Sequence, residues 1–135
     1  ALAKAEGKWV LLKCFQNWCP GCHSHGFPTL QKIVDALGDH PRVAIAGIQT
    51  VFEGFGINTR EKVRQTQERY ALRIPMGHDA GNPDGAHHPR TMRDYRTGGT
   101  PWMIVIDPTG RVVYNHFSLN AERFIEVVED RVIKG

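Results

Sequence analysis

Cys19 and Cys22 are the two side chains whose type and spacing most directly predict chemistry. Two cysteines separated by two residues in the first turn of a helix can bring their sulfurs to bonding distance without moving the backbone. Unpaired N–H groups and the helix dipole favour a thiolate there, so the pKa of the first cysteine can fall from about 8.5 to between roughly 3.5 and 7.5. The spacing therefore predicts a reversible dithiol in which the Cys19 thiolate attacks a partner disulfide and Cys22 resolves the mixed disulfide.

The neighbours of the two cysteines fit an exposed corner that a partner can reach. Pro20 suits the first turn of a helix, where its missing N–H costs nothing. Gly21 has no side chain to obstruct an incoming chain, and Trp18 is expected to cover one side of the Cys19 sulfur. We expect Trp18, Pro20 and Gly21 to belong to a substrate-binding surface.

Three other interpretations compete for the same cysteines. Residues 19–23 also match the attachment signature of c-type haem, although haem domains this small are usually helical. The conceivable second axial ligands are another histidine, Met76, Met92 or Met103. A metal site would combine both cysteines with one of the histidines His23, His25, His87 or His88. Inert structural thiols would not explain why both cysteines lie at a strand-to-helix corner.

The composition predicts one globular domain that spans residues 1–135. Apolar residues make up 41% and charged residues 23% of the sequence, close to the averages of globular proteins. No apolar run approaches the roughly 18 residues needed to cross a bilayer, so we expect no membrane span. The net charge of +3 comes from interleaved basic and acidic residues, which argues against a nucleic-acid partner.

The spacing of apolar residues predicts strands that alternate with helices. Residues 9–15 are typical of a buried strand, and a helix with one apolar face follows the dithiol to about residue 37, with Pro28 expected to kink it or to end a first short turn. A strand is expected at 42–51, followed by a polar helix at 58–72 that Asn58 or Thr59 caps, with Asn58 and Glu61 at capping-box spacing. The remaining expected elements are a short strand at 74–76, a loop at 78–90, a short helix at 91–96 and a hairpin at 102–106 and 111–117. A helix at 120–133 is expected to close the chain, with Phe124, Val127, Val128 and Val132 facing inward. This order predicts an α/β fold with a central mixed sheet and helices on both faces.

Thr100 and Pro101, directly before the hairpin, predict a second part of the site. A cis bond before proline costs less than about 1 kcal/mol, against a few kcal/mol before other residues. A cis bond would leave the Thr100 amide and carbonyl free to add a substrate strand. The alternative is a trans proline that begins an edge strand. With the dithiol and the hairpin in place, the cis form is favoured.

Three motifs together resemble the thioredoxin superfamily: Trp18–Cys22 after a strand, Gly99-Thr100-Pro101 before a strand, and the hairpin at 106–113. Over nearly the whole chain, the sequence is most similar to the TlpA/ResA-like redoxin branch of thiol-disulfide oxidoreductases. The resemblance implies a thioredoxin-like fold with a helical insertion after the second strand. It also implies that Cys19 and Cys22 form the redox-active disulfide, that no other cofactor is needed, and that Pro101 is cis beside a peptide-binding Thr100.

The resemblance further implies the partners of the reaction, which are protein or small thiols and disulfides and an electron donor. We expect a monomer. The resemblance points to the cell envelope, whereas the unpaired Cys14 and the lack of a visible leader favour the cytoplasm, so the compartment stays open. The direction of electron flow stays open as well.

The sequence departs from the family pattern at three places. Lys13 stands where thioredoxins carry a buried Asp, and its ammonium either raises the thiolate content of the site or points outward. The branch often carries a Glu shortly after the dithiol, and the nearest candidates in this sequence are Ser24 and His25. His25 can be interpreted either as a proton acceptor for Cys22 or as an ordinary surface histidine. The stretch from Cys22 to Pro28 is one residue longer than usual.

Two further functions are alternatives to the oxidoreductase. A copper- or zinc-binding carrier would use the dithiol and a loop histidine. A peroxiredoxin-like peroxidase would need a Thr three residues before Cys19 and a Pro seven residues before it, where this sequence has Gln16 and Leu12. Cys14 is expected to be a small hydrophobic core residue.

Overall fold

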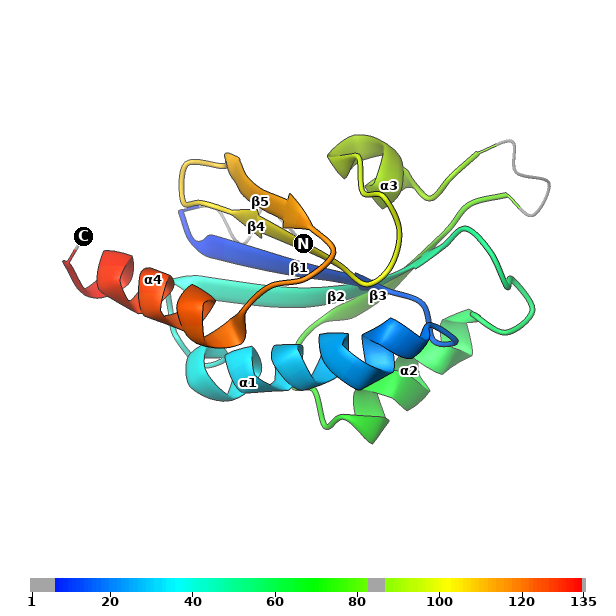
Figure 1. Cartoon of the computed structure of the whole chain (residues 1–135), viewed down its shortest axis with the longest axis horizontal. Helices are drawn as coiled ribbons and strands as arrows, with labels where there is room; N and C mark the ends of the chain where they lie inside the picture. The colour runs from blue at the N-terminus through cyan, green and yellow to red at the C-terminus, as the bar shows by residue number, and fades with distance from the viewer. Residues whose placement is uncertain (1–6, 83–86, 135) are drawn as a thin grey trace.

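A five-stranded sheet in the order β3-β2-β1-β4-β5 forms the centre of the protein (Figure 1). The computed structural model describes residues 7–82 and 87–134. The strands are β1 (Trp9–Phe15), β2 (Val43–Val51), β3 (Met76–Ala80), β4 (Trp102–Ile106) and β5 (Val112–His116). β1, β2 and β3 run parallel, whereas β4 is antiparallel to both β1 and β5.

Helices cover both faces of this sheet. The helical elements are a π-helical turn η2 (Cys22–Gly26), α1 (Phe27–Leu37), α2 (Arg60–Arg69), α3 (Arg90–Tyr95) and α4 (Ala121–Lys134). Figure 1 shows α1, α2 and α4 on one face and the short α3 on the other. The predicted α/β architecture is confirmed, and α2 is the predicted helical insertion between the second and third strands. No helix in the described ranges is long and apolar enough to cross a membrane.

The central strand β1 leads into the site and is buried on both faces. All seven of its residues are buried. Successive side chains of a strand point to opposite faces, so Leu11 and Phe15 join the core beneath α1 and α4, while Leu12 and Cys14 join the core on the α3 side. A strand held by β2 on one side and β4 on the other delivers the residues that follow it to a defined place.

The one-residue excess between Cys22 and Pro28 is accommodated by the π-helical turn. The Phe27 backbone N–H donates to the carbonyl of Cys22, five residues earlier, instead of four. A π-helical turn inserts one residue into a helix without ending it, and such turns are frequent at functional sites. Pro28 then lies in the first turn of α1, so it marks the boundary between two helical segments, as predicted.

Three predicted details are wrong. β3 is Met76–Ala80 rather than residues 74–76, because pairing with β2 from Gly47 to Val51 stabilises a segment whose own residues are poor strand formers. Of the two expected capping residues, Thr59 precedes the first turn of α2, but neither the capping box of Asn58 nor a side-chain cap of Thr59 forms. Val127 is 40% exposed instead of facing inward. The side chain of Val132 lies outside the described residues.

Replacing Leu30 tests the core beneath α1. Leu30 is fully buried among the apolar residues of α1, β1 and α4. We expect Leu30→Ala to lower the free energy of unfolding by about 2–5 kcal/mol, because it removes buried methyl groups and leaves a cavity. The matched control, Val127→Ala in α4, is expected to change it by about 0.5 kcal/mol or less. Urea denaturation measures both, and equal losses would contradict this placement of α1 and α4.

Candidate active site

Cys19 and Cys22 lie together just beyond the C-terminal end of β1. The Cys19 backbone N–H donates to the carbonyl of Gln16 at 3.0 Å, which closes the turn after the strand. The Cys22 backbone N–H donates to the Sγ atom of Cys19 at 3.2 Å. Both cysteines are free thiols in this structure. The start of the helix therefore directs a hydrogen-bond donor at the first sulfur, which is the geometry that stabilises a thiolate.

The dithiol is more buried than the sequence predicted. Cys19 is 5% exposed and Cys22 is fully buried. One reason is the loop before β4: a Cβ added to Gly21 would lie 3.3 Å from the Pro101 ring, so Gly21 packs directly against the proline. The Thr100–Pro101 peptide bond is cis. Pro101 and the two cysteines are thus brought to one place, and of the two cysteines only Cys19 retains any contact with solvent.

The surroundings of the two sulfurs separate their pKa values. The pKa of Cys19 is lowered to about 6, and the largest cause is the hydrogen bond that the Cys22 thiol donates to its sulfur. Burial opposes this effect by raising the pKa. The Cys22 N–H, the Thr100 side chain and the Lys13 charge lower it further. The pKa of Cys22 is raised, first because its proton is held in that same hydrogen bond and then by burial. At neutral pH Cys19 is therefore the thiolate and Cys22 the thiol.

A short chain of hydrogen bonds orients the Thr100 hydroxyl. The Phe52 N–H donates to the Gln16 Oε1 atom at 3.3 Å, and the Gln16 Nε2 atom donates to the Thr100 Oγ1 atom at 3.2 Å. Because Thr100 accepts a hydrogen bond from Gln16, its own proton is left to interact with another acceptor. The Thr100 side chain also helps to lower the pKa of Cys19 through a hydrogen bond.

Buried side chains from β2 and the region of α2 hold the turn that precedes Cys19. The Gln49 Oε1 atom accepts from the Asn17 N–H at 2.9 Å, and Thr66 accepts from the Asn17 side chain at 2.9 Å. The Asn58 Oδ1 atom accepts from the Trp18 N–H at 3.0 Å. Gln49 and Asn58 carry no sequence signal that marks them as site-supporting residues. Only their burial and long-range contacts reveal this role. In the sequence, the position of Asn58 indicates a helix cap instead.

Trp18 and Pro20 are the two exposed members of the predicted binding surface. The Trp18 side chain is 42% exposed. It lies beside Gly54, where an added Cβ would be 3.4 Å from the indole ring. Gly54 has a φ of +57°, a left-handed conformation that suits glycine. Trp18 and the exposed Pro20 therefore border the dithiol on the solvent side.

The two histidines of the helix start have different surroundings. Both ring nitrogens of His23 are occupied, one by the Asn17 carbonyl and the other by the Tyr70 hydroxyl. Because a carbonyl can only accept, Nε2 of His23 carries the proton and Nδ1 accepts from Tyr70. His25 is exposed and lines a shallow pocket with residues of α1 and the start of α4.

Lys13 is fully buried, which rules out the second of its two alternatives, a side chain that points outward. By the alternation of β1 its side chain leaves the sheet on the face of Leu11 and Phe15, which is the face of η2 and α1. Cys14 is also fully buried, on the α3 side of the sheet. Burial raises the pKa of the Cys14 thiol to about 12, which fits an unreactive core residue.

In the part of the chain that the structure describes, the ligand sets of the alternative sites are not assembled. Among residues 7–82 and 87–134, no three His, Cys, Asp or Glu side chains form a group that would hold a metal ion. The haem signature does not fit either, because Cys22 lies in the core and His23 is engaged on both nitrogens. Leu12, at the position of the peroxidase proline, belongs to the core on the opposite face of the sheet.

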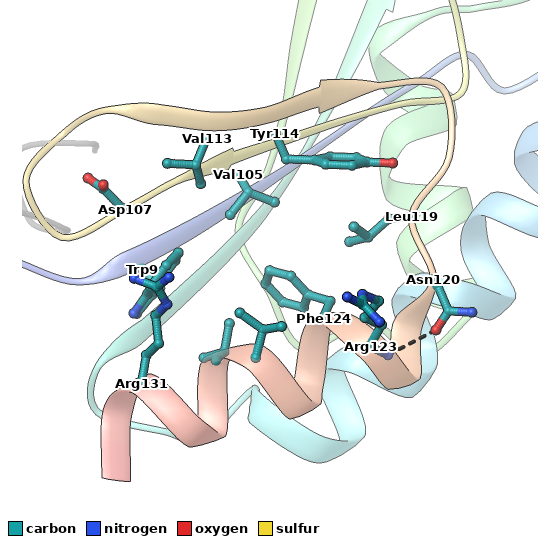
Figure 2. A pocket seen from close by; sticks show the side chains of 12 residues that line it. Trp9, Val105, Asp107, Val113, Tyr114, Leu119, Asn120, Arg123, Phe124 and Arg131 are labelled. Carbon is teal, nitrogen blue, oxygen red and sulfur yellow. Dashed lines mark hydrogen bonds between the residues drawn. The ribbon is translucent and has the colours of Figure 1, made fainter. Parts of the chain in front are cut away.

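A separate pocket of about 420 Å³ lies between the β4–β5 hairpin and α4 (Figure 2). Figure 2 shows Phe124 pointing from α4 toward Val105 of the sheet. Asn120 accepts from the Arg123 N–H at 2.9 Å and so caps the start of α4. Trp9 at the first position of β1 borders this pocket, and a strand rises about 3.3 Å per residue, so Trp9 lies roughly 20 Å from the end of β1 that precedes the dithiol.

Replacing Thr100 tests the pKa of Cys19. Above a pH of about 6 Cys19 is ionised, so its alkylation rate is expected to rise through that pH and then to level off. A hydrogen bond is worth about 0.5–1.5 kcal/mol, so we expect Thr100→Val to move the midpoint up by about 0.5–1 unit. Thr97→Val is the control, because the Thr97 hydroxyl is buried without a partner. Iodoacetamide kinetics measure both; an unchanged midpoint in Thr100→Val would refute the contact.

Replacing Asn58 tests how the turn before Cys19 is held. Asn58→Ala leaves the Trp18 N–H and the Glu53 carbonyl without their partner. We expect it to lower the free energy of unfolding by about 1–3 kcal/mol. The exposed Asn82 offers a matched control, and Asn82→Ala is expected to be near neutral. Thermal unfolding of the reduced proteins compares the two; a neutral Asn58→Ala would show that this contact does not support the turn.

The comparisons with known proteins agree with this geometry. The family model described as "AhpC/TSA family" matches residues 1–115. A thioredoxin-like superfamily protein of known crystal structure is 35% identical in sequence to this chain. The two structures superpose with a TM-score of 0.80, over 93% of this chain and 80% of the other. A thiol-disulfide isomerase from Corynebacterium glutamicum is 30% identical, with a TM-score of 0.82 over 95% of this chain and 84% of the other.

A thiol:disulfide interchange protein from Chlorobium tepidum TLS shares the fold at 20% identity, with a TM-score of 0.67 over 94% of this chain and 81% of the other. No curated protein matches this sequence. The family match covers most of the chain, and two structures with at least 30% identity superpose on nearly all of it. The chain therefore belongs to the AhpC/TSA family and has the thioredoxin-like fold of the redoxin branch.

Proposed function

We propose that the protein is a thiol-disulfide oxidoreductase that cycles Cys19 and Cys22 between a dithiol and a disulfide. The observation that carries the proposal is the hydrogen bond from the Cys22 N–H to the Cys19 sulfur, in a pair whose first member ionises at a pH of about 6. Thiolate content at neutral pH is what disulfide exchange requires of the attacking cysteine. The similarity to a protein named as a thiol-disulfide isomerase supports the same chemistry.

The reaction consists of two exchanges. The Cys19 thiolate attacks one sulfur of a partner disulfide, a bond forms between Cys19 and that sulfur, and the second partner sulfur leaves as a thiolate with the electron pair. Cys22 then loses its proton and attacks the Cys19 sulfur, which expels the first partner sulfur as a thiolate. The partner is reduced by two electrons, and the protein ends with a Cys19–Cys22 disulfide. An electron donor with a dithiol reverses these steps on the protein.

The surface around Cys19 would hold the partner chain. Trp18 and Pro20 border the sulfur on the solvent side, and Pro101 lies on the other side against Gly21. The ladder between β1 and β4 begins at the pair Cys14–Trp102, so Thr100 lies just outside it. An extended segment of a partner could therefore bind along the Thr100 backbone while its sulfur meets Cys19. A disulfide in a flexible or unfolded protein segment is the substrate that suits this edge.

Single cysteine substitutions test the proposal. We expect Cys19→Ser to abolish insulin reduction by dithiothreitol-recycled protein, because no thiolate remains to attack. Cys22→Ser is expected to accumulate a mixed disulfide on Cys19, since the resolving thiol is gone. Cys14→Ala is the control and is expected to keep the parental rate. A Cys19→Ser variant as active as the parent would overturn the proposal, and so would a Cys22→Ser variant that traps no mixed disulfide.

A further inference from the structure

The pocket between the β4–β5 hairpin and α4 is a concave site apart from the dithiol (Figure 2). Its volume is about 420 Å³, within the roughly 300–1,000 Å³ of sites that hold small organic molecules. Trp9, which lines it, is the first residue of β1, whereas the dithiol follows the last residue of that strand, Phe15. The disulfide exchange proposed above does not use this pocket.

Apolar side chains from the sheet and from α4 form the walls of the pocket. Val105 of β4 and Phe124 and Val128 of α4 are buried and make up its inner part. Nearer to solvent, Val113 of β5 is 50% exposed and Val127 of α4 is 40% exposed. Removing such apolar surface from water is favourable. The pocket therefore suits a ligand whose body is apolar and touches both walls.

Asp107 is the only carboxylate among the described residues that line the pocket, and its charge is held by the hairpin turn. Its Oδ1 atom accepts from the Thr109 hydroxyl at 2.6 Å, from the Thr109 N–H at 3.0 Å and from the Arg111 N–H at 3.1 Å. The hydrogen bond from the Thr109 hydroxyl is the largest cause that lowers the pKa of Asp107, so this carboxylate is charged at neutral pH. Figure 2 shows Asp107 at the opposite end of the pocket from Asn120. A negative group of a ligand is therefore expected at the Asn120 end.

The charged residues of α4 are sorted by sign around the pocket. Arg123, Val127 and Arg131 follow one another at four-residue spacing, which places them on one face of the helix, and all three line the pocket. In the part of the chain that the structure describes, neither guanidinium makes a hydrogen bond or an ion pair. The acidic residues of the same helix are not among the lining residues; they are Glu122, Glu126, Glu129 and Asp130. Two cationic donors thus border an apolar pocket.

The two guanidiniums are not equivalent. Figure 2 shows Arg131 below Trp9, toward the end of the pocket where Asp107 lies, and Arg123 at the end where Asn120 lies. An anion near Arg131 would also meet the Asp107 charge, so attraction and repulsion would offset each other there. No carboxylate of the lining lies at the Arg123 end. Arg123 is therefore the group best placed to bind a negative charge.

We propose that this pocket binds a small amphipathic carboxylate, with the apolar body between Val113 and Val127 and the carboxylate on Arg123. A guanidinium can donate two parallel hydrogen bonds to a carboxylate. A neutral molecule of the same shape lacks this interaction, and a cation is repelled by both arginines. Fatty acids of medium chain length and aromatic acids share the required chemistry. The inference is independent of the disulfide exchange, since neither cysteine of the dithiol lines the pocket.

The first test compares ligands that differ only in their head group. Octanoate, octanamide and octylammonium are titrated into the reduced, whole chain by isothermal titration calorimetry, below the concentrations at which they form micelles. We expect octanoate to bind about five- to tenfold more tightly than octanamide, because only the carboxylate pairs with a guanidinium. Octylammonium is expected to show no saturable binding. In a parallel arm, 2-naphthoate replaces the flexible chain by rings, and the tighter of the two carboxylates identifies a fatty or an aromatic acid as the ligand class.

Nuclear magnetic resonance locates the bound ligand. In ¹H–¹⁵N spectra we expect the amide signals of Val113, Phe124 and Val127 to move with octanoate concentration. The signals of Cys19 and Cys22 are expected to stay where they are, because the dithiol follows the other end of β1.

Replacing Arg123 tests the charge contact. Arg123→Gln is expected to weaken octanoate binding about five- to tenfold and octanamide binding by less than about twofold. Comparing two ligands in two proteins isolates the interaction between the guanidinium and the carboxylate. Arg93→Gln is the matched control, because Arg93 is an exposed arginine of α3 that does not line the pocket. It is expected to change neither affinity.

Replacing Val127 tests the apolar wall. Val127→Ala is expected to weaken octanoate and octanamide equally, by about threefold, because both lose the same apolar contact. The substitution leaves the protein folded, since Val127 contributes little to stability at this exposure. Val112→Ala is the matched control: Val112 of β5 is 41% exposed and does not line the pocket. We expect it to leave both affinities unchanged.

The outcomes decide between the proposed ligand and other occupants. Equal affinities for octanoate, octanamide and octylammonium refute the carboxylate, as does an octanoate affinity that Arg123→Gln leaves unchanged. No saturable binding at millimolar concentrations, or shifts confined to other residues, refutes the pocket as a ligand site. Pocket signals that move with protein concentration in the absence of ligand show that a second copy covers the pocket, which also overturns the inference. Insulin reduction enters none of these measurements, so the proposed function stands or falls separately.

Discussion

The hydrogen bond between the Cys22 backbone N–H and the Cys19 sulfur is the contact on which the rest of the site depends. It exists because β1 ends where the helix begins, so an unsatisfied N–H of the first turn meets the sulfur three residues earlier. With the thiol of Cys22 donating to the same sulfur, negative charge is concentrated on Cys19 and the proton is kept on Cys22. One geometric feature thus distinguishes two chemically identical side chains and assigns them different roles.

That contact requires a turn that does not move, and the protein holds it with buried amides rather than with apolar packing alone. Gln16, Gln49 and Asn58 are almost fully buried, and each binds backbone or side-chain groups near the turn. A buried polar network in which every member is satisfied is rigid, because moving one group leaves another unpaired. Asn58 and Thr66 come from the region of α2. The helical insertion therefore has a structural role at the site as well as covering the sheet.

Sequence patterns predicted the parts of the fold that follow from local chemistry. The apolar run of β1, the one-sided face of α1, the hairpin at residues 102–116 and the spacing of Cys19 and Cys22 each carry their own signal. The supporting amides carry none, because Gln49 and Asn58 acquire their roles only from partners more than 30 residues away. The displacement of β3 has the same origin, since pairing with β2 outweighs the poor strand propensity of its residues. The inward orientation of Lys13 was ambiguous in sequence because a charged residue in a strand usually marks the solvent face.

The burial of Lys13 connects these observations. Position 13 is buried because β1 is covered on both faces, so a lysine there must either be neutral or lie beside a group that becomes negative. The residues around it offer no carboxylate, and the groups that can become negative are the cysteines. A wider helical turn with glycine at position 26 leaves room for the amine, whereas a side chain at that position would displace it. The buried lysine therefore lies where neighbouring cysteines lower the cost of its charge, and the irregular turn that the extra residue creates makes this placement sterically possible.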